Sequence, residues 1–150
     1  VTGVQTCALP ILLMGSADYI AEARINRKIL GGGMRQAGVL AAAGLIALEQ
    51  SPKRLHEDHE NAQVLARGLA AIPGIKIDPK KVQTNILVFE VSGTGMTSQQ
   101  IADQLATHNV KVHAMTPTSI RMVTHCDVDR PGCQRAVAAM EQVCAAPVRA

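Results

Sequence analysis

The sequence predicts an α/β protein in which helices make up the first part and a small α+β domain with an antiparallel sheet makes up the second. Helical spacing of apolar side chains continues to about residue 72, and Pro73-Gly74 then breaks the pattern. The following short runs are typical of strands, and their connections are too short for parallel crossovers. We therefore expect a domain boundary here, with a helical part over residues 12–73 and the α+β domain over residues 74–150.

Three helices are expected before this boundary. Ser16 is suited to cap a helix over residues 17–29, which the glycines at 31–33 would end. A second helix is expected over about residues 34–49. Ser51-Pro52 would begin the third, with Ser as cap and Pro in the first turn. The apolar stripe of this third helix is formed by Leu55, Ala62, Leu65, Leu69 and Ile72.

The second half is expected to run strand, strand, helix, strand, strand, helix. Thr97 and Gln100 form a capping-box pattern for the first of these helices, over about residues 97–108. Asp129 is suited to cap the last helix, which begins near Arg130-Pro131. The expected strands cover residues 75–77, 85–91, 110–114 and 119–124.

Composition excludes several classes of protein. The 150 residues are 47% hydrophobic, which is enough for a sizeable core. A net charge of +3 without charged blocks, and only two aromatic residues, argue against nucleic-acid binding. The longest apolar run, residues 37–48, is shorter than the roughly twenty residues of a membrane span. We expect neither nucleic acid nor membrane as a partner.

The cysteines indicate a reducing compartment. They form no C-x-x-C pair and no zinc spacing, so we expect a cytoplasmic protein without a disulfide framework or bound metal. The four are Cys7, Cys126, Cys133 and Cys144.

The amino terminus is unusual. The first residue is Val rather than Met, as in a fragment or a processed chain. The opening VTGVQTCALPI resembles translated sequencing-adapter DNA, so residues 1–11 are expected to be foreign to the protein. No positive charge precedes the apolar residues 9–14, which argues against a secretion signal.

A glycine turn at residues 31–33, followed by Arg35, is a candidate anion site. Backbone N–H groups at the start of a helix attract phosphate, and the arginine fork suits it. The alternative is a flexible loop with an exposed arginine. Arg24, Arg27 and Lys28 precede the turn; a solvated face is favoured for Arg24, and both interpretations stay open for Lys28.

Arg121 is a candidate carboxylate ligand because it lies between apolar residues within the expected strand 119–124. A charged side chain there needs a partner or a cleft, since an unpaired buried cation is costly. The alternative is an arginine on an edge strand in water.

The histidines give weaker signals. His56 and His59 are three residues apart and could hold a metal, but a solvated acidic helix face is favoured. His125 and Asp127 could orient one another or cap their loop. His113, on an expected strand, is interpreted as structural.

Several of these motifs together resemble the low-specificity L-threonine aldolases. Two runs occur in the expected order and separation, GGGMRQAG at residues 31–38 and RMVTHCDV at residues 121–128. The resemblance extends from about Leu12 to about Val143 and covers less than half of a full enzyme. Shorter matching segments are Tyr19-Ile20, Arg27-Lys28, Ala41-Ala-Ala-Gly44 and Glu57-Asp-His59.

This resemblance implies a fold and a set of binding residues. The fold is the type I fold of pyridoxal-phosphate (PLP) enzymes, which is aspartate-aminotransferase-like, with the end of the large domain followed by the small domain. Arg35, with Lys28, Gly32 and Gly33 nearby, would bind the phosphate of pyridoxal 5′-phosphate, with Arg35 reaching across a subunit interface of a homodimer or homotetramer. Arg121 would bind the substrate α-carboxylate.

The implied reaction is retro-aldol cleavage of L-threonine, L-allo-threonine and related β-hydroxy-α-amino acids to glycine and an aldehyde. The Schiff-base lysine of the family lies about a dozen residues before the position of Gly15, so it is missing and the chain is expected to be inactive alone. The alternatives are another lyase or an aminotransferase of the same fold, and a non-catalytic interaction domain.

Overall fold

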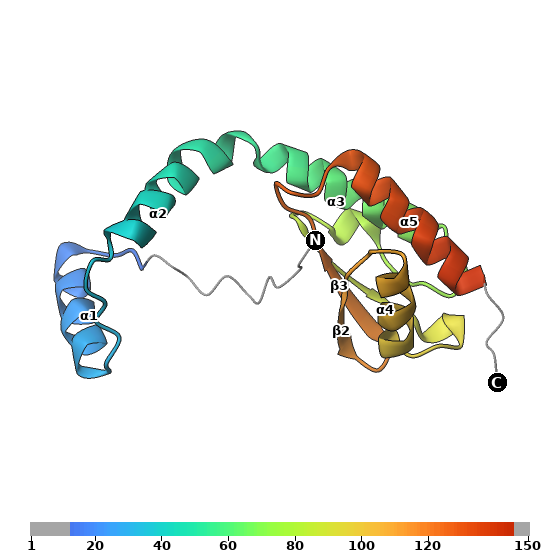
Figure 1. Ribbon diagram of the computed structural model, residues 1–150, viewed down its shortest axis with the longest axis horizontal. Coiled ribbons are helices and arrows are strands. Elements are labelled where there is room, and N and C mark those ends of the chain that lie inside the picture. Colours follow the sequence, from blue (N-terminus) through green and yellow to red (C-terminus); the bar gives the residue numbers. More distant parts are fainter. Residues whose placement is uncertain (1–12, 146–150) are drawn as a thin grey trace. The chain divides into compact units, whose positions relative to one another are not determined.

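The computed structural model describes residues 13–145, and the segment 1–11 that we expect to be foreign lies outside this range. Contacts between residues divide the described chain into two compact units, residues 13–53 and residues 54–145. Figure 1 shows their helices and strands. Among the described residues, no helix combines the length and the apolar character needed to cross a membrane.

The unit of residues 13–53 consists of helices α1 (Ala17–Ile29) and α2 (Gly38–Gln50) and the 3-10 turn η1 (Ser51–Lys53). The expected cap is confirmed, since the Ser16 hydroxyl accepts the N–H of Tyr19 at 3.3 Å.

Two helix starts that we expected are wrong. The second helix begins at Gly38 and not near residue 34, because Gln36 has a φ of 49°, which a right-handed helix does not allow. Ser51-Pro52 does not cap the third helix. The N–H of Ser51 still bonds to Ala47 at the end of α2, and the third helix begins only at Leu55.

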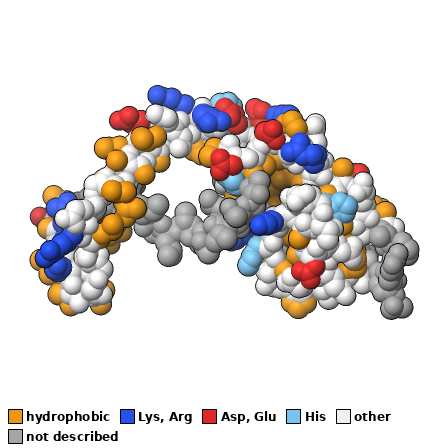
Figure 2. All heavy atoms as spheres, in the orientation of Figure 1, with side chains coloured by type: hydrophobic (Ala, Val, Ile, Leu, Met, Phe, Trp, Pro, Cys, Tyr) orange, Lys and Arg blue, Asp and Glu red, His pale blue; other side chains and the backbone are white. Residues whose placement is uncertain are grey.

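This unit has no core of its own. Neither α1 nor α2 contains a buried residue, and hydrophobic side chains line α2 in Figure 2. Val39, for example, is 76% exposed. A helix that is apolar on all sides normally lies inside a larger protein. The large exposed side chains of α2 are Val39, Leu40, Leu45, Ile46 and Leu48.

The unit of residues 54–145 is an α+β fold. Its sheet has the order β1-β3-β2, with β3 antiparallel to both neighbours, so the antiparallel sheet is confirmed. The elements in chain order are α3 (Leu55–Ala70), η2 (Pro79–Lys81), β1 (Ile86–Glu90), η3 (Ser92–Thr94), α4 (Ser98–Thr107), β2 (His113–Thr116), β3 (Ser119–Val123) and α5 (Arg130–Ala145).

Two expected strands differ in the structure. Residues 75–77 make only an isolated bridge, between Lys76 and Glu90. The strand expected at 110–114 begins at His113, and Val110 and Val112 instead pack against the core from the preceding loop. The alternation of apolar residues correctly indicated that side chains of these segments contact the core. The strand pairing that we inferred from it was wrong.

One face of the sheet packs against helices. Leu87 and Phe89 of β1 lie opposite Met122 and Ile120 of β3, and all four side chains are buried. Helix α3 contacts β1 and α5, and α4 contacts β2 and α5, so the core lies between the sheet and these helices. The expected capping box of Thr97 and the cap by Asp129 are both present.

At two places in this unit, glycine residues let neighbouring segments of the chain pack closely together. A Cβ atom at Gly68 of α3 would lie 2.6 Å from both Cγ atoms of Val137 of α5. The backbones of Gly74 and Gly93 also touch, with Gly93 N–H donating to the Gly74 carbonyl at 3.1 Å, and Gly74 has a φ of 88°. The break expected at Pro73-Gly74 is therefore a tight turn, and α3 before it packs with the sheet. The domain boundary at 73/74 concerns the complete protein and stays a prediction.

Candidate functional site

Arg121 lies on the exposed face of the sheet. Its neighbours along β3, Ile120 and Met122, point into the core, so the side chain of Arg121 extends from the opposite face. In the sheet register it lies between Val88 of β1 and His113 of β2. Because β3 is the central strand and Arg121 is half-buried, the alternative of an edge-strand arginine in water is excluded.

Aliphatic side chains surround this arginine. Ile86 and Val88 are 47% and 50% exposed, and Val123 is half-buried on the same face. We call the surface formed by Ile86, Val88, His113, Arg121 and Val123 the open face. Arg121 extends from this face between aliphatic side chains of β1 and β3.

The glycine turn lies in the other unit, directly after α1. Gly31 adopts a φ of 78°, and the N–H of Gly32 donates to the Arg27 carbonyl at 2.9 Å. A Cβ atom at Gly33 would come within 3.0 Å of Lys28 Cδ and 3.5 Å of its Nζ, so the lysine side chain folds back over the turn. Arg35 follows on an exposed turn.

The turn does not open a helix directly, because α2 starts only at Gly38. A helix N-terminus at the three glycines, which the sequence analysis invoked for anion binding, is therefore wrong. What supports an anion site at this turn is the ammonium of Lys28 beside Gly33, with Arg35 two residues further along the chain.

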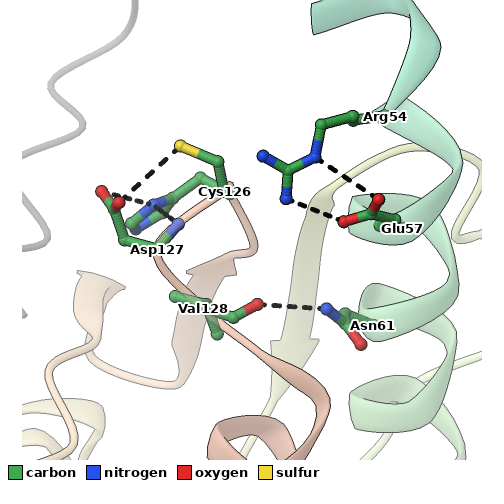
Figure 3. A network of polar contacts seen from close by, with 7 residues as sticks. Arg54, Glu57, Asn61, Cys126, Asp127 and Val128 are labelled. Carbon is green, nitrogen blue, oxygen red and sulfur yellow. Dashed lines mark hydrogen bonds and ion pairs between the residues drawn. The ribbon is translucent and has the colours of Figure 1, made fainter.

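Another group of polar residues lines a cleft that the sequence analysis did not predict. The cleft has a volume of about 300 Å³ and lies between the start of α3 and the loop after β3. Arg54 pairs with Glu57 through two contacts, Nη2 to Oε2 at 2.9 Å and Nε to Oε1 at 3.4 Å (Figure 3). The hydrogen bond from Arg54 lowers the pKa of the Glu57 carboxyl and raises that of Arg54 itself.

The loop after β3 is anchored to α3 and to the residue before β1. Thr124 is fully buried; its N–H donates to the Asn85 carbonyl at 2.9 Å and its hydroxyl to the Asp58 carbonyl at 2.7 Å. The Asn61 amide donates to the Val128 carbonyl at 3.1 Å. Residues 125–127 are therefore held in place by hydrogen bonds of the residues at both ends of this segment.

His125 and Asp127 orient one another, one of the two roles expected for them. The Asp127 N–H donates to His125 Nδ1 at 3.3 Å, and an Asp127 carboxylate oxygen lies 3.5 Å from the same atom. Cys126 Sγ lies 3.8 Å from Asp127 Oδ1. His56 and His59 face different surfaces, since His56 lines the cleft described above and His59 lines a groove beside it.

Comparison with known proteins gives consistent matches. A family model described as beta-eliminating lyase matches residues 7–92. Low-specificity L-threonine aldolase 1 of Arabidopsis thaliana is 36% identical over 115 residues, covering 76% of this chain and 32% of that protein. Low specificity L-threonine aldolase of Escherichia coli (strain K12) is 40% identical over 119 residues, covering 79% and 34%. The chain thus spans about a third of the length of these relatives.

A solved structure supports the fold. The structure of MppP soaked with the product 2-ketoarginine matches with a TM-score of 0.51 and 15% identity, over 67% of this chain and 30% of that one. The small antiparallel sheet with its helices is thus the carboxy-terminal part of a type I PLP-enzyme fold, as expected. The chain belongs to the beta-eliminating lyase family and is similar to threonine aldolases over most of its length.

Proposed function

We propose that the complete protein is a PLP-dependent aldehyde-lyase that cleaves L-threonine, L-allo-threonine and related β-hydroxy-α-amino acids to glycine and an aldehyde. Two relatives named as low-specificity threonine aldolases, at 36% and 40% identity, support this reaction. The structural observation that carries the proposal is the half-buried Arg121 at the centre of the open face.

Arg121 binds and orients the substrate. Its planar guanidinium donates two parallel hydrogen bonds to an α-carboxylate, which fixes the position and the rotation of the amino acid. The aliphatic side chains of Ile86 and Val88 lie beside it on the same face, and with a substrate bound over them they would limit the access of water to the charged contact. Fixing the rotation matters because the Cα–Cβ bond must be held in one orientation to break.

The glycine turn fits the phosphate end of the cofactor. Lys28 lies over Gly33, and Arg35 follows on an exposed turn, so a dianionic phosphate would meet two cations and a backbone without side chains. When bound, pyridoxal phosphate supplies an electron sink for cleavage at Cα. Within this chain, Lys28, Gly32, Gly33 and Arg35 would hold it.

The lysine that bonds covalently to the cofactor is not among those of this chain. All six lysines are exposed. A lysine that forms such a bond needs a desolvated or cation-rich environment that lowers its pKa, and a solvated surface does not supply one. We therefore propose that the chain is inactive alone and that the complete protein contributes this lysine and the base for the β-hydroxyl proton.

Two further features belong to the proposal. The exposed apolar side chains of α2 support a homodimer or homotetramer in which α2 is covered. The described cysteines, Cys126, Cys133 and Cys144, are free thiols, which supports a reducing cytoplasm.

The test is steady-state cleavage of L-threonine by the complete enzyme, with glycine and acetaldehyde measured directly. Arg121→Ala should lower kcat/KM by about a hundredfold or more, given about 2 to 5 kcal/mol for truncating one partner of a buried charge pair. Arg121→Lys should recover only part of the activity, because a point charge lacks the fork. Thermal melts and cofactor titrations should change little in either variant.

Two outcomes would contradict the role of Arg121, and three would favour another function. Wild-type kcat/KM in Arg121→Ala would make Arg121 a surface residue, and a collapsed melt would make it structural. Formation of 2-oxobutanoate from threonine would favour a β-eliminating lyase, and keto-acid formation with a second amino acid would favour an aminotransferase. Failure of the complete protein to bind the cofactor would favour a non-catalytic interaction domain.

A further inference from the structure

We propose that the loop after β3 binds a divalent transition-metal ion of the zinc class through His125, Cys126 and Asp127. An imidazole nitrogen, a sulfur and a carboxylate oxygen from these residues lie within 4.8 Å of one another. Ligands around a tetrahedral zinc ion are about 3.3 to 3.8 Å apart, given metal–ligand distances of about 2.0 to 2.3 Å. The Cys126 and Asp127 side chains are exposed, so they have room to rotate and would close the remaining gap on binding. The inference is independent of the aldolase reaction.

The backbone already holds these three residues in a tight turn. The Val128 N–H donates to the His125 carbonyl at 2.8 Å, which folds residues 125–128 back on themselves. The turn is fixed before it by the buried Thr124, and after it by the bond from Asn61 to the Val128 carbonyl. Binding therefore requires ordering of side chains but little ordering of the backbone, which lowers its entropic cost.

The side chains are oriented toward one another before any ion binds. His125 is the least exposed of the three, with a side chain 20% exposed, and its Nδ1 atom faces both the N–H and the carboxylate of Asp127. Cys126 Sγ lies 3.8 Å from the same carboxylate (Figure 3). An ion at this position would replace weak polar contacts with three ligand bonds.

The two arginines that line the cleft do not exclude a metal. Arg54 lies across the cleft from Cys126, and a positive charge there would oppose a metal ion. However, Arg54 forms a two-contact ion pair with Glu57, which offsets its charge. The second arginine of the cleft, Arg130, is likewise paired with Glu60 at 2.8 Å.

The donor set selects the class of ion. Magnesium and calcium take oxygen ligands, whereas nitrogen, sulfur and oxygen together suit Zn²⁺ and Co²⁺. Three protein ligands on an exposed loop leave a fourth position for water. The loop is held by its own hydrogen bonds, so the ion is expected to exchange and not to be needed for folding.

The experiment is a Co²⁺ titration of the 150-residue chain in the presence of a non-thiol reductant. A cobalt–thiolate bond gives a near-ultraviolet charge-transfer band, which should saturate at one equivalent and disappear when Zn²⁺ is added. Cys126→Ser should abolish the band, and Asp127→Asn should weaken Co²⁺ binding by about tenfold or more. Cys144→Ser on α5 and Asp103→Asn on α4 are matched controls and should leave the titration unchanged.

Any of three results would overturn the site. A band that survives in Cys126→Ser would assign the thiolate to another cysteine. An affinity that is unchanged in Asp127→Asn, or the lack of a saturable band in the wild-type chain, would show that these residues do not form a site. Circular dichroism of each variant checks folding, and if Cys126→Ser is unfolded the Asp127→Asn titration decides.

Discussion

The packing of α3 against α5 can be tested with one added methyl group. Both Cγ atoms of Val137 lie 2.6 Å from the position that a Cβ atom would take at Gly68. Rotation of the valine side chain does not remove the clash, because its Cβ atom is itself only 3.2 Å away and one methyl group always remains near the contact. The helices must therefore move apart in Gly68→Ala.

Two effects of opposite sign determine the result. Replacing glycine by alanine within a helix gains about 1 kcal/mol from helix propensity, whereas overpacking costs about 1 to 3 kcal/mol. We expect a net loss of up to about 2 kcal/mol, and for a domain of this size each kcal/mol lowers Tm by about 4–8 °C. In a Val137→Ala background the two methyl contacts are gone and only the 3.2 Å contact with the Cβ atom of residue 137 remains, so the same Gly68→Ala change should be clearly less destabilising.

The assay is a thermal melt of the four proteins of this double-mutant cycle, followed by circular dichroism. Gly44→Ala on α2 is a matched control, because a Cβ atom there has nothing within 4 Å and the melt of the unit 54–145 should not change. If Gly68→Ala stabilises the protein in both backgrounds, α3 and α5 do not approach as the structure shows.

Three other outcomes are expected. Residues 54–145 alone should melt cooperatively, with a Tm within a few degrees of the full chain. The reason is that all buried hydrophobic side chains of the described residues lie between Ala62 and Val143. A non-cooperative melt of residues 54–145 would contradict this prediction. Pyridoxal phosphate and borohydride should trap no stoichiometric adduct on the chain, and a single modified lysine, for example Lys28, found by mass spectrometry would disprove it. Burial raises the pKa of the Cys133 thiol, so a thiol reagent at pH 8 should label exposed Cys126 faster than Cys133; equal rates would contradict the burial.

Local signals in the sequence predicted the helix ends that depend on short-range bonds. Ser16, Thr97 with Gln100, and Asp129 all accept backbone N–H groups within three residues, and all three caps were expected. The start of α2 was wrong because the left-handed backbone at Gln36 has no clear signal in residue type.

The site could be predicted only in part. That Arg121 lies in a strand follows from its apolar neighbours, but that this strand is central depends on pairing with both β1 and β2, which the sequence does not show. The cleft was missed because its contacts span long separations, such as the 67 residues between Asn61 and Val128. The one signal for this cleft in the sequence was a polar residue, Asn61, next to Ala62 of the apolar stripe.

The two candidate binding regions differ in how much structure they have within this chain. Arg121 lies on a sheet whose helices and strands bury a core within residues 54–145, so the geometry that we propose for carboxylate binding does not depend on the rest of the protein. The turn with Lys28 and Arg35 joins two helices that bury no side chain, so its geometry requires a covering surface. The substrate carboxylate site should therefore survive in residues 54–145, while affinity for phosphate should appear only when the complete protein covers α2. Comparing the binding of a simple carboxylate and of inorganic phosphate to the chain and to the complete enzyme separates these two cases.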